Sequence, residues 1–164
     1  MSVQCPKLDH LSENIRTYWE EKQQERGETL HQFSYAILVE PVRFPAPEKS
    51  GILYIMEHNV WFEDFPKPPL FFLNSPSNYK KTQFHIPRTS ITDVELITRS
   101  AFEQRFFDKQ PSSGPLQGIL NIFKTDPVYC IISERQENGD LLQHVFREVD
   151  EPEGWLKALQ PRTQ

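Results

Sequence analysis

The chain has 164 residues and a formal net charge of −5, with 37% hydrophobic and 25% charged residues. This composition is typical of one globular domain, with or without an extension, and argues against a disordered chain. The acidic balance disfavours a nucleic-acid-binding surface, because such surfaces neutralise phosphates with Lys and Arg. No run approaches the roughly 20 apolar residues that cross a bilayer.

Cysteine usage predicts a reduced environment. Cys5 and Cys130 are far apart in the sequence, and two cysteines make neither a disulfide framework nor a metal site. The N-terminal segment lacks the apolar core of a signal peptide. We therefore expect a cytoplasmic protein without a cofactor or a bound metal.

Residues 7–26 are predicted to form an amphipathic helix that ends near Gly27. Its apolar residues recur at helical spacing and are Leu8, Leu11, Ile15, Tyr18 and Trp19. Such a helix either packs on its own domain or docks a partner through side chains such as Ile15 and Trp19. We treat residues 1–30 as an N-terminal helical extension and residues 31–164 as the main domain.

Segments rich in aromatic and β-branched residues predict about seven antiparallel strands after residue 31. They cover residues 32–42, 51–57, 59–65, 82–99 (with a break at Pro87), 116–125, 127–135 and 141–149. Asn138-Gly139 is the strongest hairpin signal. A short helix is expected after residue 99, and a terminal helix is expected after Pro152. Seven strands favour a closed or sandwiched sheet, because a flat sheet would leave exposed edges.

Two stretches carry a resemblance to a known family. The first contains Gly51, Leu53-Tyr54, a polar turn at His58-Asn59 and the aromatic strand 61–64; the second contains Ile86-Pro87, Ile91 and Asp93-Val94, and Trp155 with Leu159 follows near the end. In this order they resemble the pleckstrin-homology (PH) superfold, in its GRAM-like branch, over roughly residues 33–160. The resemblance implies a mostly β, seven-stranded antiparallel barrel or sandwich capped by the C-terminal helix, to which the N-terminal amphipathic helix is an addition.

No motif predicts catalysis. His58, His85 and His144 show none of the spacings typical of metal or catalytic sites. Glu63 and Asp64 are neighbours in one strand, so their side chains should point to opposite faces and form no carboxylate pair. We expect a protein that is not an enzyme. A small-molecule barrel or a minor enzyme built around these histidines is the less favoured alternative.

A non-catalytic binding module is therefore the main expectation, with protein–protein interaction or self-association first. The alternative is a peripheral membrane module that binds anionic lipid headgroups. Phosphoinositide-binding members of the PH superfold use basic residues on the loop after the first strand and on the strand that follows it. Here the candidate headgroup ligands are Arg43, Lys49, Lys67, Lys80 and Lys81. Residues 51–57 contain no Lys or Arg, which weakens the lipid interpretation.

The long connection 66–81 contains four consecutive apolar residues, Leu70, Phe71, Phe72 and Leu73. They form an extra strand or flap over the core, an exposed patch for a protein partner, or an insertion into a membrane. A large exposed apolar patch usually marks an interaction site. We therefore include these residues with Ile15 and Trp19 as candidates for partner binding.

Overall fold

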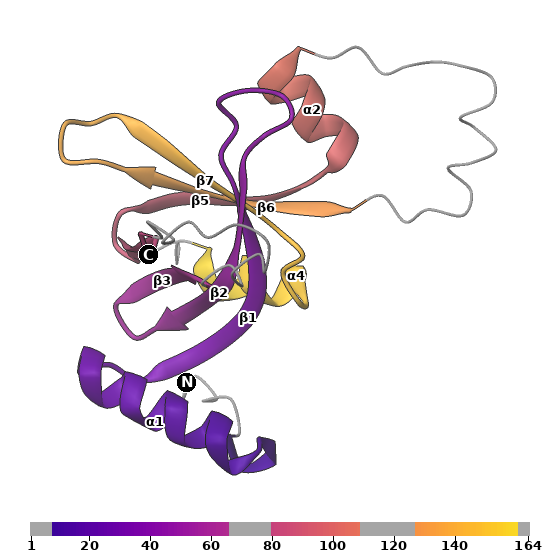
Figure 1. Cartoon of the computed structure of the whole chain (residues 1–164). Coiled ribbons are helices and arrows are strands. Elements are labelled where there is room, and N and C mark those ends of the chain that lie inside the picture. Colours follow the sequence, from indigo (N-terminus) through magenta and orange to yellow (C-terminus); the bar gives the residue numbers. More distant parts are fainter. Residues whose placement is uncertain (1–7, 66–79, 109–126, 161–164) are drawn as a thin grey trace. The chain divides into compact units, whose positions relative to one another are not determined.

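The structure of the protein is a computed structural model that describes residues 8–65, 80–108 and 127–160. Its elements in chain order are a 3-10 helix (Leu8–His10), α1 (Glu13–Arg26), β1 (Leu30–Val39), β2 (Glu48–Met56), β3 (Asn59–Asp64), β4 (Gln83–Pro87), β5 (Ile91–Thr98), α2 (Arg99–Phe107), β6 (Val128–Arg135), β7 (Leu141–Arg147) and α4 (Pro152–Leu159) (Figure 1). The strand predicted at 116–125 lies outside the described residues.

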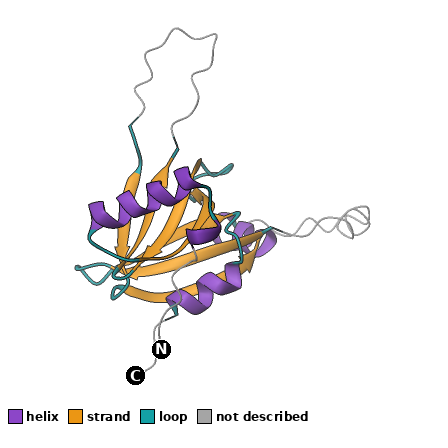
Figure 2. Ribbon diagram, turned by 90° about the horizontal axis from the view of Figure 1, so that it is seen from below, coloured by secondary structure: helices purple, strands orange, loops and turns teal. Residues whose placement is uncertain are grey.

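The strands form one antiparallel sheet in the order β4-β3-β2-β1-β7-β6-β5, and they are orange in Figure 2. The prediction of a mostly β chain with seven antiparallel strands, an N-terminal helix and a C-terminal helix is confirmed. The order ends at β4 and β5, which do not pair with each other in the described part of the chain, so the sheet is open and not a closed barrel. The strand expected over 82–99, with its break at Pro87, is two separate strands. Pro87, which lacks a backbone N–H, ends β4, and β5 pairs with β6.

The chain divides into two compact units. Unit 1 combines Met1–Ser34 with Gly51–Thr89, and unit 2 combines Tyr35–Ser50 with Ser90–Gln164. Both β1 and β2 therefore contribute residues to each unit.

Unit 1 is built around α1 and the strands β2, β3 and β4. Trp19 of α1 is buried in one cluster with Leu30, Tyr54 and Met56. Gly27 ends α1 in the left-handed conformation, with a φ of 65°, and its N–H bonds to the carbonyl oxygen of Gln23. The prediction of a helix near residues 7–26 is thus confirmed, and Trp19 of its apolar face is buried in the core of unit 1.

The hairpin between β2 and β3 depends on a glycine and on a carboxylate. A Cβ atom at Gly51 would lie 2.2 Å from the carbonyl oxygen of Glu63 and 2.8 Å from the Cα atom of Asp64, so β2 and β3 approach too closely for any side chain there. At the turn, the Glu28 carboxylate accepts a hydrogen bond from the backbone N–H of His58 (2.8 Å) and another from Nδ2 of Asn59 (2.7 Å). His58 is therefore a turn residue.

Unit 2 is built from β5, β6, β7 and the helices α2 and α4. Phe102 of α2 stacks on Tyr129 with ring centroids 4.4 Å apart, in a buried cluster with Val39, Ile131 and Val145. The predicted β6–β7 hairpin is present, and Gly139 supplies a φ of 89° at its turn. Helix α4 lies against β5 and buries its Trp155 completely.

Candidate functional site

The candidate lipid ligands are divided between the two units. Arg43 is exposed after β1 in unit 2, and Lys49 of the same unit places its Nζ atom 2.9 Å from Oε1 of Glu40. Lys80 and Lys81 are exposed in unit 1, and Nζ of Lys81 lies 2.6 Å from Oε2 of Glu63. Lys67 lies outside the described residues. Lys49 and Lys81 are thus each engaged by a carboxylate.

The candidate partner-binding residues on α1 differ in exposure. Ile15 is 44% exposed, whereas Trp19 is 1% exposed and belongs to the core of unit 1. Leu70, Phe71, Phe72 and Leu73 lie outside the described residues. Ile15 is therefore the α1 candidate that is available at the surface.

A groove in unit 1 collects exposed apolar side chains. It has a volume of about 630 Å³ and is lined by Asn14, Ile15, Tyr18, Trp19, Phe33, Ile52, Glu63, Asp64, Phe65 and Lys81. Among the described residues of unit 1, the large hydrophobic side chains that remain exposed are Ile15 (44%), Tyr18 (39%) and Phe65 (47%). All of them line this unit 1 groove, so the exposed apolar surface of unit 1 is concentrated at one place.

The sequence of α1 explains how the groove is formed. Ile15, Tyr18 and Trp19 are spaced i, i+3 and i+4, so they share one side of the helix. Trp19 turns inward and packs on Phe33, with ring centroids 4.6 Å apart. Ile15 and Tyr18 lie beside it with much of their surface exposed. One stripe of the helix thus supplies both the buried floor and the exposed wall of the groove.

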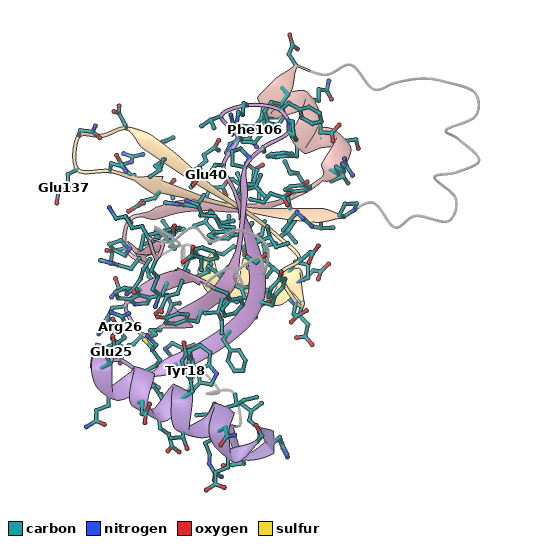
Figure 3. All side chains as sticks on the ribbon, in the orientation of Figure 1. Tyr18, Glu25, Arg26, Glu40, Phe106 and Glu137 are labelled. Atoms are coloured by element: carbon teal, nitrogen blue, oxygen red, sulfur yellow. The ribbon has the colours of Figure 1, made fainter. Side chains whose placement is uncertain are left out.

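The polar end of the groove is organised by the carboxylate of Glu63, which is 4% exposed. Nζ of Lys22 lies 3.1 Å from Oε1 of Glu63, and Nη2 of Arg26 lies 3.2 Å from the same oxygen. Lys81 binds the other oxygen, and the hydroxyl group of Tyr54 donates a hydrogen bond to Oε1. The guanidinium group of Arg26 also lies 3.8 Å above the centre of the Trp61 ring. Figure 3 labels Arg26, together with Tyr18 and Glu25, on α1.

These contacts control the ionisation of Glu63. Burial alone would raise the pKa of the carboxyl group, but hydrogen bonds from Lys81, Tyr54 and Lys22 outweigh it and lower the pKa of Glu63 to about 2. Burial, followed by the hydrogen bond to Glu63, raises the pKa of Tyr54. At neutral pH the site therefore contains a buried, fully ionised carboxylate, a protonated tyrosine and paired cations. This arrangement fixes α1 to β3 and has no poised acid or base.

Glu63 and Asp64, neighbours in β3, both line the groove. Oδ1 of Asp64 accepts a hydrogen bond from the backbone N–H of Thr82 at 2.8 Å.

In the described ranges of the chain, no group of at least three His, Cys, Asp or Glu side chains is arranged to hold a metal ion. No described helix is long and apolar enough to cross a bilayer.

The three histidines considered for chemistry have different surroundings. His58 is exposed at the β2–β3 turn, and the ring of His85 lies 4.7 Å from that of Trp61. In unit 2, Nε2 of His144 lies 2.9 Å from Oε2 of Glu134. None of these histidines is among the described residues that line the unit 1 groove.

Sequence reasoning missed the convergence on Glu63 and the contribution of Phe33 and Ile52 to the groove. Lys22 and Glu63 are 41 positions apart, and Lys81 and Glu63 are 18 positions apart. One signal was present in the sequence. Lys22 follows the apolar residues Tyr18 and Trp19 by one helical turn and Arg26 follows them by two, so these cations lie on the packed side of α1.

Comparison with known proteins gives no family. No family model matches the chain. No curated protein matches it either. Among solved structures, the chain is similar to the C-terminal domain of an unknown protein from Leishmania infantum, with 17% sequence identity and a TM-score of 0.44. That similarity covers 89% of this chain and 94% of the other.

Proposed function

We propose that the protein is a non-catalytic binding module that binds a protein partner through the unit 1 groove. The resemblance of residues 33–160 to the PH superfold suggests a binding module by analogy alone; because a fold does not fix function, the proposal rests on the groove. Within that proposal, the protein is a cytoplasmic GRAM-like domain extended by α1, and the extension supplies one wall of the binding site.

The observation that carries this proposal is the concentration of exposed apolar surface. Ile15, Tyr18 and Phe65 are each more than a third exposed, and they line one groove together. Contiguous exposed apolar surface usually marks an interaction site, and a few aromatic or aliphatic anchors provide most of the affinity of protein interfaces. Because its walls are exposed, the groove suits a segment of polypeptide laid across it better than a fully enclosed small molecule.

Pull-down with the purified chain as bait tests the proposal. Ile15→Glu places a charge in the groove and should abolish capture of the partner. Thr17→Glu introduces the same charge at an exposed position of α1 that does not line the groove, and it should leave capture intact. The captured protein is then identified and its binding to both variants measured in purified form. Equal binding to wild type and Ile15→Glu would contradict the proposal.

Light scattering separates a foreign partner from self-association. If the partner is a second copy, the wild-type chain forms dimers that Ile15→Glu converts to monomers and Thr17→Glu preserves. Dimers that survive in Ile15→Glu would place self-association at another surface.

Membrane binding is the second candidate, and one observation in unit 2 favours it. Val42 is 78% exposed and Phe44 is 50% exposed, and they flank Arg43 in the connection between β1 and β2. Apolar side chains beside a cation suit a peripheral contact with anionic lipid, in which each basic residue contributes about 1 kcal/mol.

Flotation with vesicles containing phosphatidylserine tests this candidate. Wild type should float at low salt, and a Val42→Ser/Phe44→Ser variant should stay in the bottom fraction. A Leu141→Ser/Leu142→Ser variant removes two other exposed apolar side chains (61% and 41%) from β7 and serves as the control. If the wild type stays in the bottom fraction at low salt, membrane binding is ruled out.

A further inference from the structure

The exposed surface of α1 is acidic although its sequence is nearly balanced in charge. Its four carboxylates are all exposed, and they belong to Glu13, Glu20, Glu21 and Glu25. Of its three cations, the Arg16 side chain is 42% exposed beside Glu20, whereas Lys22 and Arg26 are largely buried. The helix thus presents negative charge outward.

The ion pairs with Glu63 explain this asymmetry. Lys22 and Arg26 are only 13% and 14% exposed, because both side chains turn toward the buried Glu63 carboxylate. The charges of Lys22 and Arg26 therefore point mostly into unit 1, although both also contact the exposed carboxylate of Glu25, at 3.3 and 3.5 Å. Lys81, which also lines the groove, is held by the same carboxylate at 2.6 Å.

The acidic surface continues the wall of the groove along α1. Asn14, Tyr18, Glu21 and Glu25 are spaced i, i+4, i+7 and i+11, so they form one stripe on the helix. Asn14 and Tyr18 line the groove, and Glu21 and Glu25 follow them toward the end of α1. A segment that lies along this wall therefore meets apolar side chains first and carboxylates within the next two turns.

From this juxtaposition we propose that the groove binds a basic amphipathic helix of a partner protein. This inference rests on the proposed function and specifies its ligand. The partner helix inserts two or three large apolar side chains, spaced i, i+3 or i+4, between Ile15, Tyr18 and Phe65. Its Lys or Arg side chains, within the next two turns, face Glu21 first and then Glu25, which already pairs with Lys22 and Arg26. Complementary charge sets the orientation of such a helix and speeds its association.

Binding of synthetic peptides to the full chain tests the inference. The probes are amphipathic 18-residue helices with the same Leu and Phe face and a polar face made of Lys, of Gln or of Glu. Affinities are measured by calorimetry at low and at moderate salt. The Lys peptide should bind most tightly and lose affinity as salt increases, because exposed charges are screened.

Matched variants locate the binding site. Ile15→Glu should remove binding of the Lys peptide, whereas Thr17→Glu should retain it. Glu21→Lys should weaken binding roughly twofold to tenfold, the range expected when an exposed ion pair is replaced by a repulsion. Glu137→Lys makes the same change at an exposed turn in unit 2 and should have no effect.

Each result has a definite meaning. If the Gln or Glu peptide binds at least as tightly as the Lys peptide, the preference for a basic helix is wrong. If Ile15→Glu also removes that binding, the groove remains a protein-binding site. Lys-peptide binding that Ile15→Glu does not change would overturn the inference. Failure of all three peptides, together with unchanged partner capture by Ile15→Glu, would overturn both the inference and the proposed function.

Discussion

Among single residues, Glu63 should have a large effect on stability, because basic side chains from α1 and from residue 81 meet at its carboxylate. Glu63→Gln should lower the free energy of unfolding at pH 7 by roughly 3 kcal/mol, since it leaves partly buried cations without their partner. Urea unfolding of the variant and the wild type measures this difference. Glu137→Gln, at the exposed β6–β7 turn, is the control and should match the wild type.

The same carboxylate makes stability depend on pH. Its native pKa of about 2 is below the usual value of 4.5, so its contribution is complete above about 4.5 and is lost as the pH falls toward 2. We therefore expect the difference between wild type and Glu63→Gln to shrink steadily from pH 5 to pH 2.5 in urea titrations. A difference that stays constant over that range would contradict the assigned ionisation.

Gly51 allows a second residue-scale prediction. Gly51→Ala should destabilise the chain strongly, because a Cβ atom would meet the backbone of Glu63 and Asp64 at 2.2 and 2.8 Å. Gly27→Ala, which faces open space but has a positive φ, should cost only about 1–2 kcal/mol. Thermal melts of both variants compare the two effects. An equal loss at both positions would mean that β2 and β3 can separate at little cost.

At the scale of elements, α1 is attached to unit 1 by Trp19. Trp19→Ala should cost roughly 3–5 kcal/mol, the usual range for truncation of a buried aromatic side chain. Ile15 lies one turn earlier and is 44% exposed, so Ile15→Ala should change the free energy of unfolding by less than about 1 kcal/mol. Urea titrations of the two variants test this contrast, which requires that α1 be part of the folded unit and not a detached extension.

Most elements could be predicted from local sequence patterns. Gly27, Asn138-Gly139 and Pro152 mark the ends of elements through their own backbone preferences, and the structure confirms them. The burial of β1 was harder to predict than its position. Ala36, Ile37, Leu38 and Val39 are all buried, so this part of β1 is covered on both faces. Burial on both faces depends on which elements pack there, and the strand's own sequence does not specify it.

The candidate site was only partly predictable. Ile15 was found because helical spacing places it beside Trp19 on an apolar stripe. Phe33, Ile52 and Phe65 reach the groove from separate strands and from the segment after β3, and local periodicity contains no information about that meeting. The choice of Glu63 over Asp64 as the centre of the ion pairs also depends on which face of β3 the helix covers.

At the scale of the whole molecule, strands shared between the units should couple their unfolding. β1 and β2 run through both units, so neither unit can lose these strands alone. Cys130 in unit 2 reports on this coupling, because burial raises its pKa to about 12 and leaves the thiol unreactive in the native state. In a Cys5→Ser background, Cys130 is the remaining thiol that can be labelled.

We expect Trp19→Ala, in unit 1, to lower the urea concentration at which Cys130 becomes reactive, although the two residues belong to different units. Alkylation across a urea series, followed by mass spectrometry, measures that midpoint. Ile15→Ala is the matched control and should leave it unchanged. If Trp19→Ala does not move the midpoint, the two units unfold independently.

Trp19 also provides an optical signal at the proposed binding site. Its indole lines the unit 1 groove, and the other tryptophans of the chain, Trp61 and Trp155, are not among the described lining residues. In a variant with Phe at positions 61 and 155, tryptophan fluorescence would come from Trp19 alone. Arrival of any occupant would then change the emission of the unlabelled protein and allow the association to be followed in real time.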